Sequence, residues 1–379
     1  MHDIQAYYDN QFRLSGQTGS IYAPMSTLVQ AAHHRRIAIL DSLPVGSLAN
    51  KTVVDFGTGS WGFACIYPRL HECRFAIGMD ISREAVRQSE AVSARGSFPY
   101  GTRYKYYVSD GTHIPLADSS VDLFFTGECI EHVENTDAFL DEIYRVLVPD
   151  GVLILTTPNA RPLIYRTLGD RYAVGPEHIA LMDYRELVSY VEPRFTIDIS
   201  KGYNSSVHTA LDGAVSDEAF AKQWASAGED LPEDASGIVM MARKKPGGGP
   251  RTYSRTTYNW TSDQLVRRGV WTKLSLHHSL SGLMGKPGSD LALSFSASSL
   301  VVLLWSHDWS GVAELTLDRE SHVVDLFEHV GGFRRVVFNG LDAAREHALV
   351  LRPAGLRNPR SHDDQVIFYS ASAYSRSAG

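Results

Sequence analysis

The chain has 379 residues, 44% of them apolar, and carries a formal net charge of −7. This length allows two hydrophobic cores, because single cores usually stop growing at about 250–300 residues. The acidic balance argues against a nucleic-acid partner, which normally needs a basic excess. Only three cysteines occur, without CxxC spacing, so the sequence suggests neither a disulfide framework nor a zinc cluster; they are Cys65, Cys73 and Cys129.

The N-terminal stretch MHDIQAYYDNQFRLSG has no basic region followed by an apolar one, as a secretory signal would. No stretch approaches the roughly eighteen uninterrupted apolar residues of a membrane span. We therefore expect a soluble, cytoplasmic protein without a membrane partner.

From Lys51 to about Ala242, short apolar runs alternate with longer mixed segments. Helices are predicted from Arg83 to Ala94, with Ser82 as N-cap, and from Thr136 to Val146, where apolar residues recur at helical spacing. This alternation is typical of a mostly parallel sheet with helices between its strands. The predicted strands are TVVDF, RFAIGMD, KYYVSD, VDLFFTG, GVLILTT, FTIDIS and GIVMMA.

The stretch RKKPGGGPR, Arg243 to Arg251, places three glycines between two prolines and predicts a linker, with its centre at residues 246–251. After it the pattern changes to closely spaced β-forming runs such as VAELTLD and QVIFYSASAY, without helices between them. This favours an antiparallel β-sandwich, or jelly roll. We divide the chain into residues 1–245, which begin with a helical cap that includes Tyr7 and Tyr8, the linker at residues 246–251, and residues 252–379.

Three features follow the first three predicted strands. Gly57 and Gly59 in VVDFGTGSWG offer a tight turn and a close backbone approach, which suits a nucleotide or an ordinary strand-to-helix connection. Asp80, in GMDIS, stands where a carboxylate can accept hydrogen bonds from ribose hydroxyls. Asp110 and Gly111 follow the third strand, and an Asp-Gly pair is also a common turn.

Taken in order, these features resemble the class I S-adenosylmethionine-dependent methyltransferases, including the ubiquinone and sugar O-methyltransferases. The resemblance runs from about Thr52 to Lys244, and its turn is DxGxG rather than the GxGxxG of NAD-binding domains. It implies a Rossmann-like α/β sheet that binds S-adenosylmethionine. The stretches that carry it are VVDFGTGSWG, GMDIS, SDGTHIPLADSSVDLFFTGECIEHVEN and FLDEIYRVLVPDGVLILTTPN.

The resemblance also implies which residues bind the cofactor. Asp55, Gly57 and Gly59 would line the methionine end, with Arg36 as a candidate partner of its carboxylate. Asp80, with Ile81 beside it, would hold the ribose. The remaining candidates are Asp110 and Gly111 at the adenine and Glu128 beside the cofactor. Trp61 stands where the family often has a third glycine, and Gly62 follows one position later.

Two histidines are candidate catalytic residues, because an acceptor hydroxyl must lose its proton. His132, in ECIEHVEN, resembles the general base of some small-molecule and sugar O-methyltransferases, or it orders its turn. His178, in PEHIAL, could serve as base or bind the acceptor, with Glu177 orienting it, or make a structural contact. Magnesium held by carboxylates is the alternative to a protein base, but the sequence nominates no metal ligands.

The C-terminal region resembles the galactose-binding-like jelly rolls that accompany carbohydrate-active proteins. Candidate sugar contacts are Trp305, His307, Trp309 and Arg360. The alternative is that the tryptophans fill the core and the domain serves oligomerisation. The sequence thus predicts a methyltransferase that O-methylates a saccharide or glycosylated metabolite. The alternatives are transfer to a phenol, amine or carbon of another small molecule, and an inactive glycan-binding or scaffolding protein.

Overall fold

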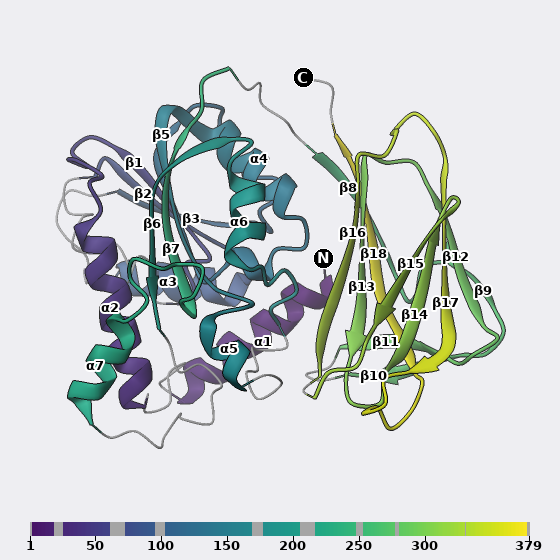
Figure 1. The fold of residues 1–379 in the computed structure, drawn as a ribbon. Helices are drawn as coiled ribbons and strands as arrows, with labels where there is room; N and C mark the ends of the chain where they lie inside the picture. The colour runs from purple at the N-terminus through teal and green to yellow at the C-terminus, as the bar shows by residue number, and fades with distance from the viewer. Residues whose placement is uncertain are drawn as a thin grey trace. The chain divides into compact units, whose positions relative to one another are not determined.

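The computed structural model divides the chain into two compact units. One comprises Met1–Val174 and Ala180–Arg251, and the other includes Thr252–Ala378. Figure 1 shows helices around a central sheet in the first unit and strands alone in the second. The structure describes residues 2–18, 26–60, 73–94, 103–168, 177–204, 217–247, 253–276, 280–329 and 331–376.

A seven-stranded sheet forms the centre of the first unit, in the order β3-β2-β1-β4-β5-β7-β6. The first five strands run parallel, and β7 runs antiparallel to both β5 and β6. All seven strands lie where the apolar runs predict them. They are β1 (Thr52–Phe56), β2 (Phe75–Asp80), β3 (Arg103–Val108), β4 (Val121–Gly127), β5 (Leu147–Pro158), β6 (Phe195–Tyr203) and β7 (Gly237–Lys244).

Helices flank the sheet (Figure 1), and the two predicted ones are confirmed as α3 (Arg83–Ala94) and α4 (Thr136–Val146). Ser82 accepts a hydrogen bond from the amide of Ala85 and Asn135 from that of Ala138, so each begins at a side-chain cap. The other helices are α1 (His2–Thr18), α2 (Thr27–Ser42), α5 (Leu163–Leu168), α6 (Tyr184–Val191), α7 (Glu218–Ser226) and the 3-10 turn η2 (Ile130–His132).

The core of the first unit lies on both faces of the sheet. Val54 packs in the cluster that contains residues of α4 and α6, whereas its neighbour Val53 packs in the cluster that contains residues of α2. Successive side chains of a strand point to opposite faces, so both faces are covered. Strands buried in this way are apolar throughout, which explains why the runs in the sequence do not alternate.

The second unit consists of two antiparallel sheets that share one core. One sheet has the order β10-β11-β18-β13-β16, with β8 also paired to β18, and the other has the order β15-β14-β17-β12-β9. The antiparallel prediction is confirmed, although β8, β9 and β11 were not predicted. The strands are β8 (Tyr253–Asn259), β9 (Val266–Arg268), β10 (Trp271–Ser275), β11 (Ser281–Gly285), β12 (Asp290–Phe295), β13 (Ser299–Ser306), β14 (Gly311–Leu317), β15 (Glu320–Asp325), β16 (Gly332–Asn339), β17 (His347–Arg357) and β18 (Val366–Arg376).

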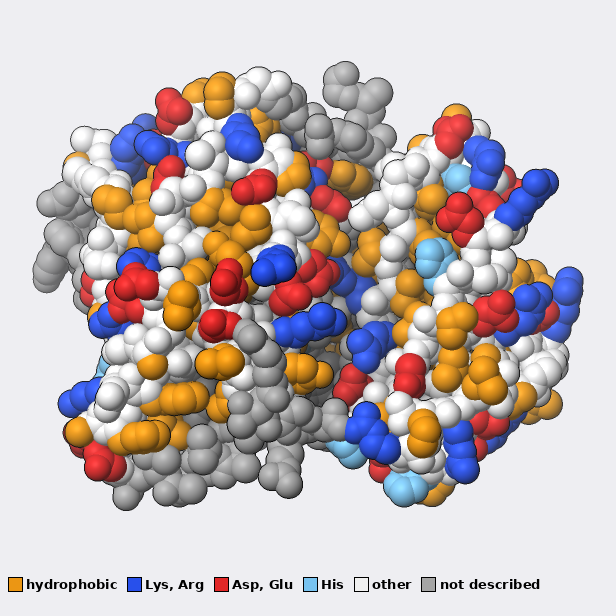
Figure 2. All heavy atoms as spheres, viewed as in Figure 1, with side chains coloured by type: hydrophobic (Ala, Val, Ile, Leu, Met, Phe, Trp, Pro, Cys, Tyr) orange, Lys and Arg blue, Asp and Glu red, His pale blue; other side chains and the backbone are white. Residues whose placement is uncertain are grey.

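The stretch Arg243 to Arg251 overlaps the end of β7. Arg243 and Lys244 are the last residues of β7, where Arg243 pairs with Val152 of β5, so the connection begins after them. Within the described ranges, no helix is long and apolar enough to cross a membrane. The face of the molecule shown in Figure 2 carries acidic and basic side chains interspersed among apolar ones.

Candidate functional site

The predicted cofactor residues gather where the parallel strands β1 to β4 end. The turn after β1 is held against β2, because the amides of Gly57 and Thr58 both donate to the carbonyl of Met79, at 2.8 and 3.0 Å. Asp55 is buried at the end of β1 and accepts a hydrogen bond from the Thr58 hydroxyl at 3.1 Å. Ligands bind outside this edge in open α/β sheets, so the position suits a binding site.

Both glycines of this turn have backbone angles that favour glycine, with φ of 79° at Gly57 and 62° at Gly59. A Cβ atom on Gly57 would lie 2.7 Å from Sγ of Cys129, which follows β4. The turn is therefore both conformationally special and closely packed. Trp61, the position of the missing third glycine, lies outside the described residues.

Asp80 joins the turn after β1 to the start of α3. Its carboxylate accepts from the amide of Gly59 at 3.0 Å and from the amide of Ser82 at 2.8 Å. Burial raises the pKa of Asp80 to about 6, although the backbone hydrogen bonds from Ser82, Gly59 and the half-buried Ile81 oppose this rise. This is the carboxylate that the sequence assigns to the ribose.

Asp110 and Gly111 form a fixed turn after β3. Oδ1 of Asp110 accepts from the amide of Thr112 at 3.0 Å and from its hydroxyl at 2.7 Å. Gly111 has a φ of 80°, and a Cβ atom there would lie 2.7 Å from the ring of Phe139. The turn reading and the predicted adenine contact are compatible, since the turn presents Asp110 at the same sheet edge.

Glu128 has a structural role that the sequence did not show. Its φ is 49°, and its Oε1 accepts from the hydroxyls of Thr156 at 2.8 Å and Tyr203 at 3.0 Å. Arg36 of α2 lies 3.3 Å from the same oxygen. Arg36 thus pairs with Glu128, which ties α2 to the end of β4, rather than standing apart for a methionine carboxylate.

His132 lies in η2, directly after this edge of the sheet. Its Nδ1 is 3.0 Å from the hydroxyl of Tyr8, and its Nε2 is 3.8 Å from Oε1 of Glu131. Glu131 is fully buried, and its other carboxylate oxygen accepts from the hydroxyl of Thr157 at 2.8 Å. Burial, together with the nearby Glu128 carboxylate, raises the pKa of Glu131 well above its usual range.

The structure places the second candidate histidine beside the first. Glu131, His132 and His178 each offer a ligand atom within 4.8 Å of the other two. The segment that carries His178 is held near Glu131 by Ala180, whose amide donates to the carbonyl of Glu131 at 2.7 Å. Two imidazoles and a carboxylate could hold a divalent metal as well as serve a proton transfer. The sequence did not show that the two histidines lie together or that Glu131 belongs to their cluster, because His178 is far from the other two residues along the chain.

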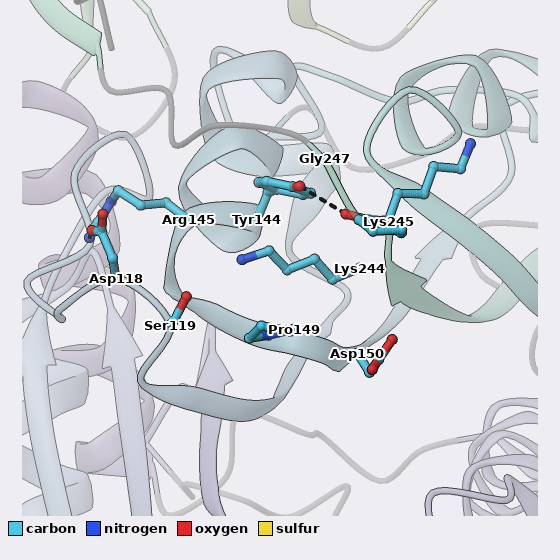
Figure 3. A pocket seen from close by; sticks show the side chains of 10 residues that line it. Asp118, Ser119, Tyr144, Arg145, Pro149, Asp150, Lys244, Lys245 and Gly247 are labelled. Atoms are coloured by element: carbon cyan, nitrogen blue, oxygen red, sulfur yellow. Dashed lines mark hydrogen bonds and ion pairs between the residues drawn. The ribbon is translucent and has the colours of Figure 1, made fainter.

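A pocket of about 400 Å³ lies elsewhere in the first unit, at the opposite ends of the parallel strands. Its lining includes Ser119 just before β4, Pro149 at the start of β5 and Lys244 at the end of the antiparallel β7. Figure 3 shows Lys244 extending below the ring of Tyr144, with its Nζ 4.5 Å from the ring centroid. None of the predicted cofactor or catalytic residues lines this pocket.

In the second unit, the four candidate sugar contacts separate into two groups. Trp305 is only 6% exposed on β13 and packs edge-on against Phe333, so its predicted binding role is wrong and the core reading holds for it. Trp309 is 49% exposed in the turn before β14. His307 Nδ1 accepts from the Trp309 amide at 2.9 Å, and Arg360 lies over the ring of Phe327.

Comparisons with known proteins agree with this geometry. Residues 54–155 match the family model of a methyltransferase domain. A ubiquinone/menaquinone biosynthesis C-methyltransferase of Desulfotalea psychrophila is 30% identical over 141 residues, which cover 37% of this chain and 54% of that protein. Residues 54–155 are thus similar to methyltransferase domains, and the longer match from Mycolicibacterium smegmatis described below is named as S-adenosylmethionine-dependent. The predicted enzyme class and cofactor are confirmed at this level.

Two further similarities describe how far the likeness extends. A probable S-adenosylmethionine-dependent methyltransferase of Mycolicibacterium smegmatis is 27% identical over 196 residues, which cover 51% of this chain and 71% of that protein. Phosphoethanolamine N-methyltransferase 1 of Haemonchus contortus has a TM-score of 0.44 and 16% identity, over 65% of this chain and 50% of that one. The chain spans about half the length of the Desulfotalea protein.

The residues at the sheet edge fit S-adenosylmethionine. A buried carboxylate, Asp80, stands at the end of β2, and the backbone after β1 has no side chain at either glycine. The sequence placed Tyr8 in an N-terminal helical cap without its contact to His132, and it missed three other neighbours of this edge, which come from α1, η2 and β6. They are Asp9, Glu131 and Tyr203. Only Glu131, beside His132 in the ECIEHV turn, stood in a motif that could have shown it.

Proposed function

We propose that the protein transfers a methyl group from S-adenosylmethionine to a hydroxyl group of a saccharide or glycosylated metabolite. When bound, S-adenosylmethionine supplies a methyl carbon that is electrophilic because the sulfur beside it is positively charged. The observation that carries the proposal is the position of His132, a titratable group just past the end of β4, with its two ring nitrogens next to Tyr8 and Glu131.

The residues after β1 to β3 divide the work of binding. Asp80 would accept from the ribose hydroxyls, and Asp110 would accept from the adenine amino group. Gly57 and Gly59 allow the methionine end to approach the backbone closely, and Asp55 places negative charge near its ammonium. Binding of this kind mainly aligns the donor with the acceptor.

His132 would act as the general base. An alcohol is a weak nucleophile while it keeps its proton, whereas imidazole accepts protons near neutral pH. Proton transfer makes the imidazole cationic, and the Tyr8 hydroxyl, 3.0 Å from Nδ1, can accept a hydrogen bond from that cation. His178, in the same cluster, would bind the acceptor.

A platform on the second unit supports a saccharide as acceptor. The exposed ring of Trp309 lies 5.5 Å from the ring of His362, at a tilt of 51°. The two loops that carry them are joined by hydrogen bonds from the His362 amide to the Asp308 carbonyl at 2.9 Å and from the Gln365 amide to the Trp309 carbonyl at 3.2 Å. A rigid aromatic face beside polar groups suits the apolar face and the hydroxyls of a sugar ring.

The strand order of this unit supports the jelly-roll interpretation. The strands β11, β13, β16 and β18 lie in one sheet, and β12, β14, β15 and β17 lie in the other. The chain thus crosses repeatedly between two packed antiparallel sheets, as in a double-sheet jelly roll. We propose that the unit serves glycan recognition rather than catalysis.

The test is an acceptor screen with methyl-labelled S-adenosylmethionine and the full-length protein. We expect label in saccharides or glycosides and in none of the aglycone phenols and amines, and His132→Gln should abolish transfer without weakening S-adenosylhomocysteine binding. Label in a phenol, amine or carbon acceptor alone would overturn the saccharide proposal. Lack of S-adenosylhomocysteine binding by calorimetry would favour an inactive glycan-binding protein.

A further inference from the structure

The turn that carries Trp309, between β13 and β14, is fixed by hydrogen bonds at its first residue. The amide of His307 donates to the hydroxyl of Ser310 at 3.0 Å, and the amide of Ser310 donates to the carbonyl of His307 at 3.0 Å. The same carbonyl accepts from the amide of Glu328 at 3.3 Å, which joins the turn to the chain that follows β15. The backbone of His307 is therefore held at both of its polar groups.

The imidazole of His307 holds Trp309 directly. Nδ1 of His307 lies 2.9 Å from the amide nitrogen of Trp309. The direction of this hydrogen bond is fixed, because a backbone amide can only donate, so Nδ1 presents its lone pair and the hydrogen of the neutral ring sits on Nε2. His307 thus acts as Asn or Asp does in a turn when its side chain accepts from the amide two residues further on.

The second ring nitrogen of His307 is a hydrogen-bond donor on the turn that also exposes Trp309. Within the part of the chain that the structure describes, no group accepts from Nε2, and 17% of the His307 side chain is exposed. Sugar rings bind by stacking on an aromatic face and by hydrogen bonds to neighbouring polar groups. One turn therefore supplies both an exposed ring and a donor whose hydrogen has a fixed position.

Protonation of His307 would remove its contact with Trp309. A protonated ring carries hydrogen on both nitrogens, so Nδ1 would meet the Trp309 amide donor to donor. The charged groups that act on this ring are Asp308, whose Oδ1 is 3.9 Å from Nδ1, and Asp363, on the loop before β18. Both favour the protonated form, but burial has the larger effect and lowers the pKa of His307. The ring is therefore neutral near pH 7 and protonated only in acid.

We propose that His307 determines saccharide binding at this platform: its Nε2–H donates to an oxygen of the sugar that stacks on Trp309, and its neutral ring holds Trp309 in position. The inference rests on the proposed function, in which the second unit recognises a glycan. It follows that the unit binds its saccharide at neutral pH and releases it in acid, because only the neutral ring accepts from the Trp309 amide.

The test is calorimetric titration of methyl glycosides into the full chain, at about pH 7.5 and at about pH 5, on either side of the ordinary pKa of histidine. We expect the affinity of the wild type to fall by about 5- to 10-fold at the lower pH, as for the loss of one hydrogen bond. Chemical shifts of the His307 ring nitrogens should place the hydrogen on Nε2 at the higher pH.

Two variants assign the effect to a residue. His307→Asn keeps a side-chain acceptor for the Trp309 amide but has neither a titrating group nor the Nε2 donor. It should bind about 3- to 10-fold more weakly than the wild type at the higher pH and equally well at both pH values. The matched control is His362→Asn, which removes the other histidine beside Trp309 and should keep the ratio of affinities seen in the wild type.

The outcomes also separate this inference from the proposed function. Glycoside binding that is equal at both pH values in the wild type, or that changes with pH to the same degree in His307→Asn, would overturn the role of His307 and leave glycan recognition intact. A pH dependence that disappears in His362→Asn would assign the effect to His362 instead. Absence of glycoside binding at either pH would overturn both the role of His307 and glycan recognition by this unit.

Discussion

The carboxylate of Asp80 and the amide of Gly59 are joined by a hydrogen bond of 3.0 Å, across two loops that follow different strands. This contact joins the carboxylate that we propose for the ribose to the turn that we propose for the methionine end of the cofactor. The hydrogen bond favours the ionised form of Asp80, whereas burial disfavours it and raises the pKa of Asp80 to about 6. Cofactor binding should therefore depend on the protonation of this one group.

We expect the affinity for S-adenosylhomocysteine to rise with pH through about 6. The raised pKa means that the free protein holds a proton on Asp80 below pH 6, whereas the ribose hydroxyls need the ionised carboxylate as acceptor. Binding must then displace that proton, so Kd at pH 5 should be about 10-fold higher than at pH 7.5. Calorimetry across this range measures the effect. Asp80→Ala should bind weakly with little pH dependence, while the exposed Asp230→Asn should follow the wild type.

Gly57→Ala should destabilise the protein more than Gly46→Ala. Both glycines have positive φ, of 79° and 69°, so both changes carry a backbone cost of about 1 kcal/mol. Only at Gly57 would the new methyl group meet another atom, Sγ of Cys129 at 2.7 Å, whereas nothing lies within 4 Å at Gly46. Thermal unfolding should show a larger loss of Tm for Gly57→Ala. Equal losses of Tm would mean that Cys129 moves away from the new methyl group at little cost in free energy.

How much of this site the sequence predicts depends on the distance between its parts along the chain. Asp55, Asp80 and Asp110 follow three strands of a parallel sheet, so their common edge follows from the strand pattern. The contact of Tyr8 with His132 spans 124 positions, and no periodicity connects a helix near the N-terminus to that turn. Tertiary packing alone decides such a contact.

In the second unit, the exposure of a tryptophan depends on whether it lies within a strand or after the strand's end. Trp305 lies within β13, which is buried throughout, and Trp309 lies in the turn after it. A run such as SLVVLLWS is apolar on both faces, so the pattern cannot show that its tryptophan is core rather than surface. Only the strand's place between β18 and β16 shows this.

Tyr203→Phe should destabilise the first unit by about 1–2 kcal/mol, with a reduced Tm as the measurement. Tyr203 is buried, and its hydroxyl donates to Oε1 of Glu128 at 3.0 Å, so its removal takes one hydrogen bond from a partly exposed carboxylate. Tyr165→Phe, at an exposed position, is the control. If Arg36 and Thr156 satisfy Glu128 by themselves, the two variants will unfold alike.

Methyl transfer should persist after dialysis against a chelator. In the proposed mechanism, a ring nitrogen of His132 accepts the acceptor's proton, and a metal bound by the cluster of Glu131, His132 and His178 would occupy a ring nitrogen of His132. Turnover in EDTA, compared with turnover after addition of Mg²⁺ or Zn²⁺, measures the difference. Activity that disappears with EDTA and returns with one metal would replace the base mechanism by a metal-dependent one.

Trp309→Ala should weaken saccharide binding by about 3- to 10-fold, which corresponds to about 0.5–1.5 kcal/mol for one aromatic contact. The exposed ring beside His362 offers an apolar face, and its turn is held by the hydrogen bond from the Trp309 amide to His307. Quenching of intrinsic tryptophan fluorescence by a panel of methyl glycosides measures the affinity of the full-length protein. The control is Leu356→Ala, which removes an exposed apolar side chain from β17. Equal affinities for the two variants would assign glycan binding to another surface, since truncation of a stacking ring cannot leave the stacked complex unchanged.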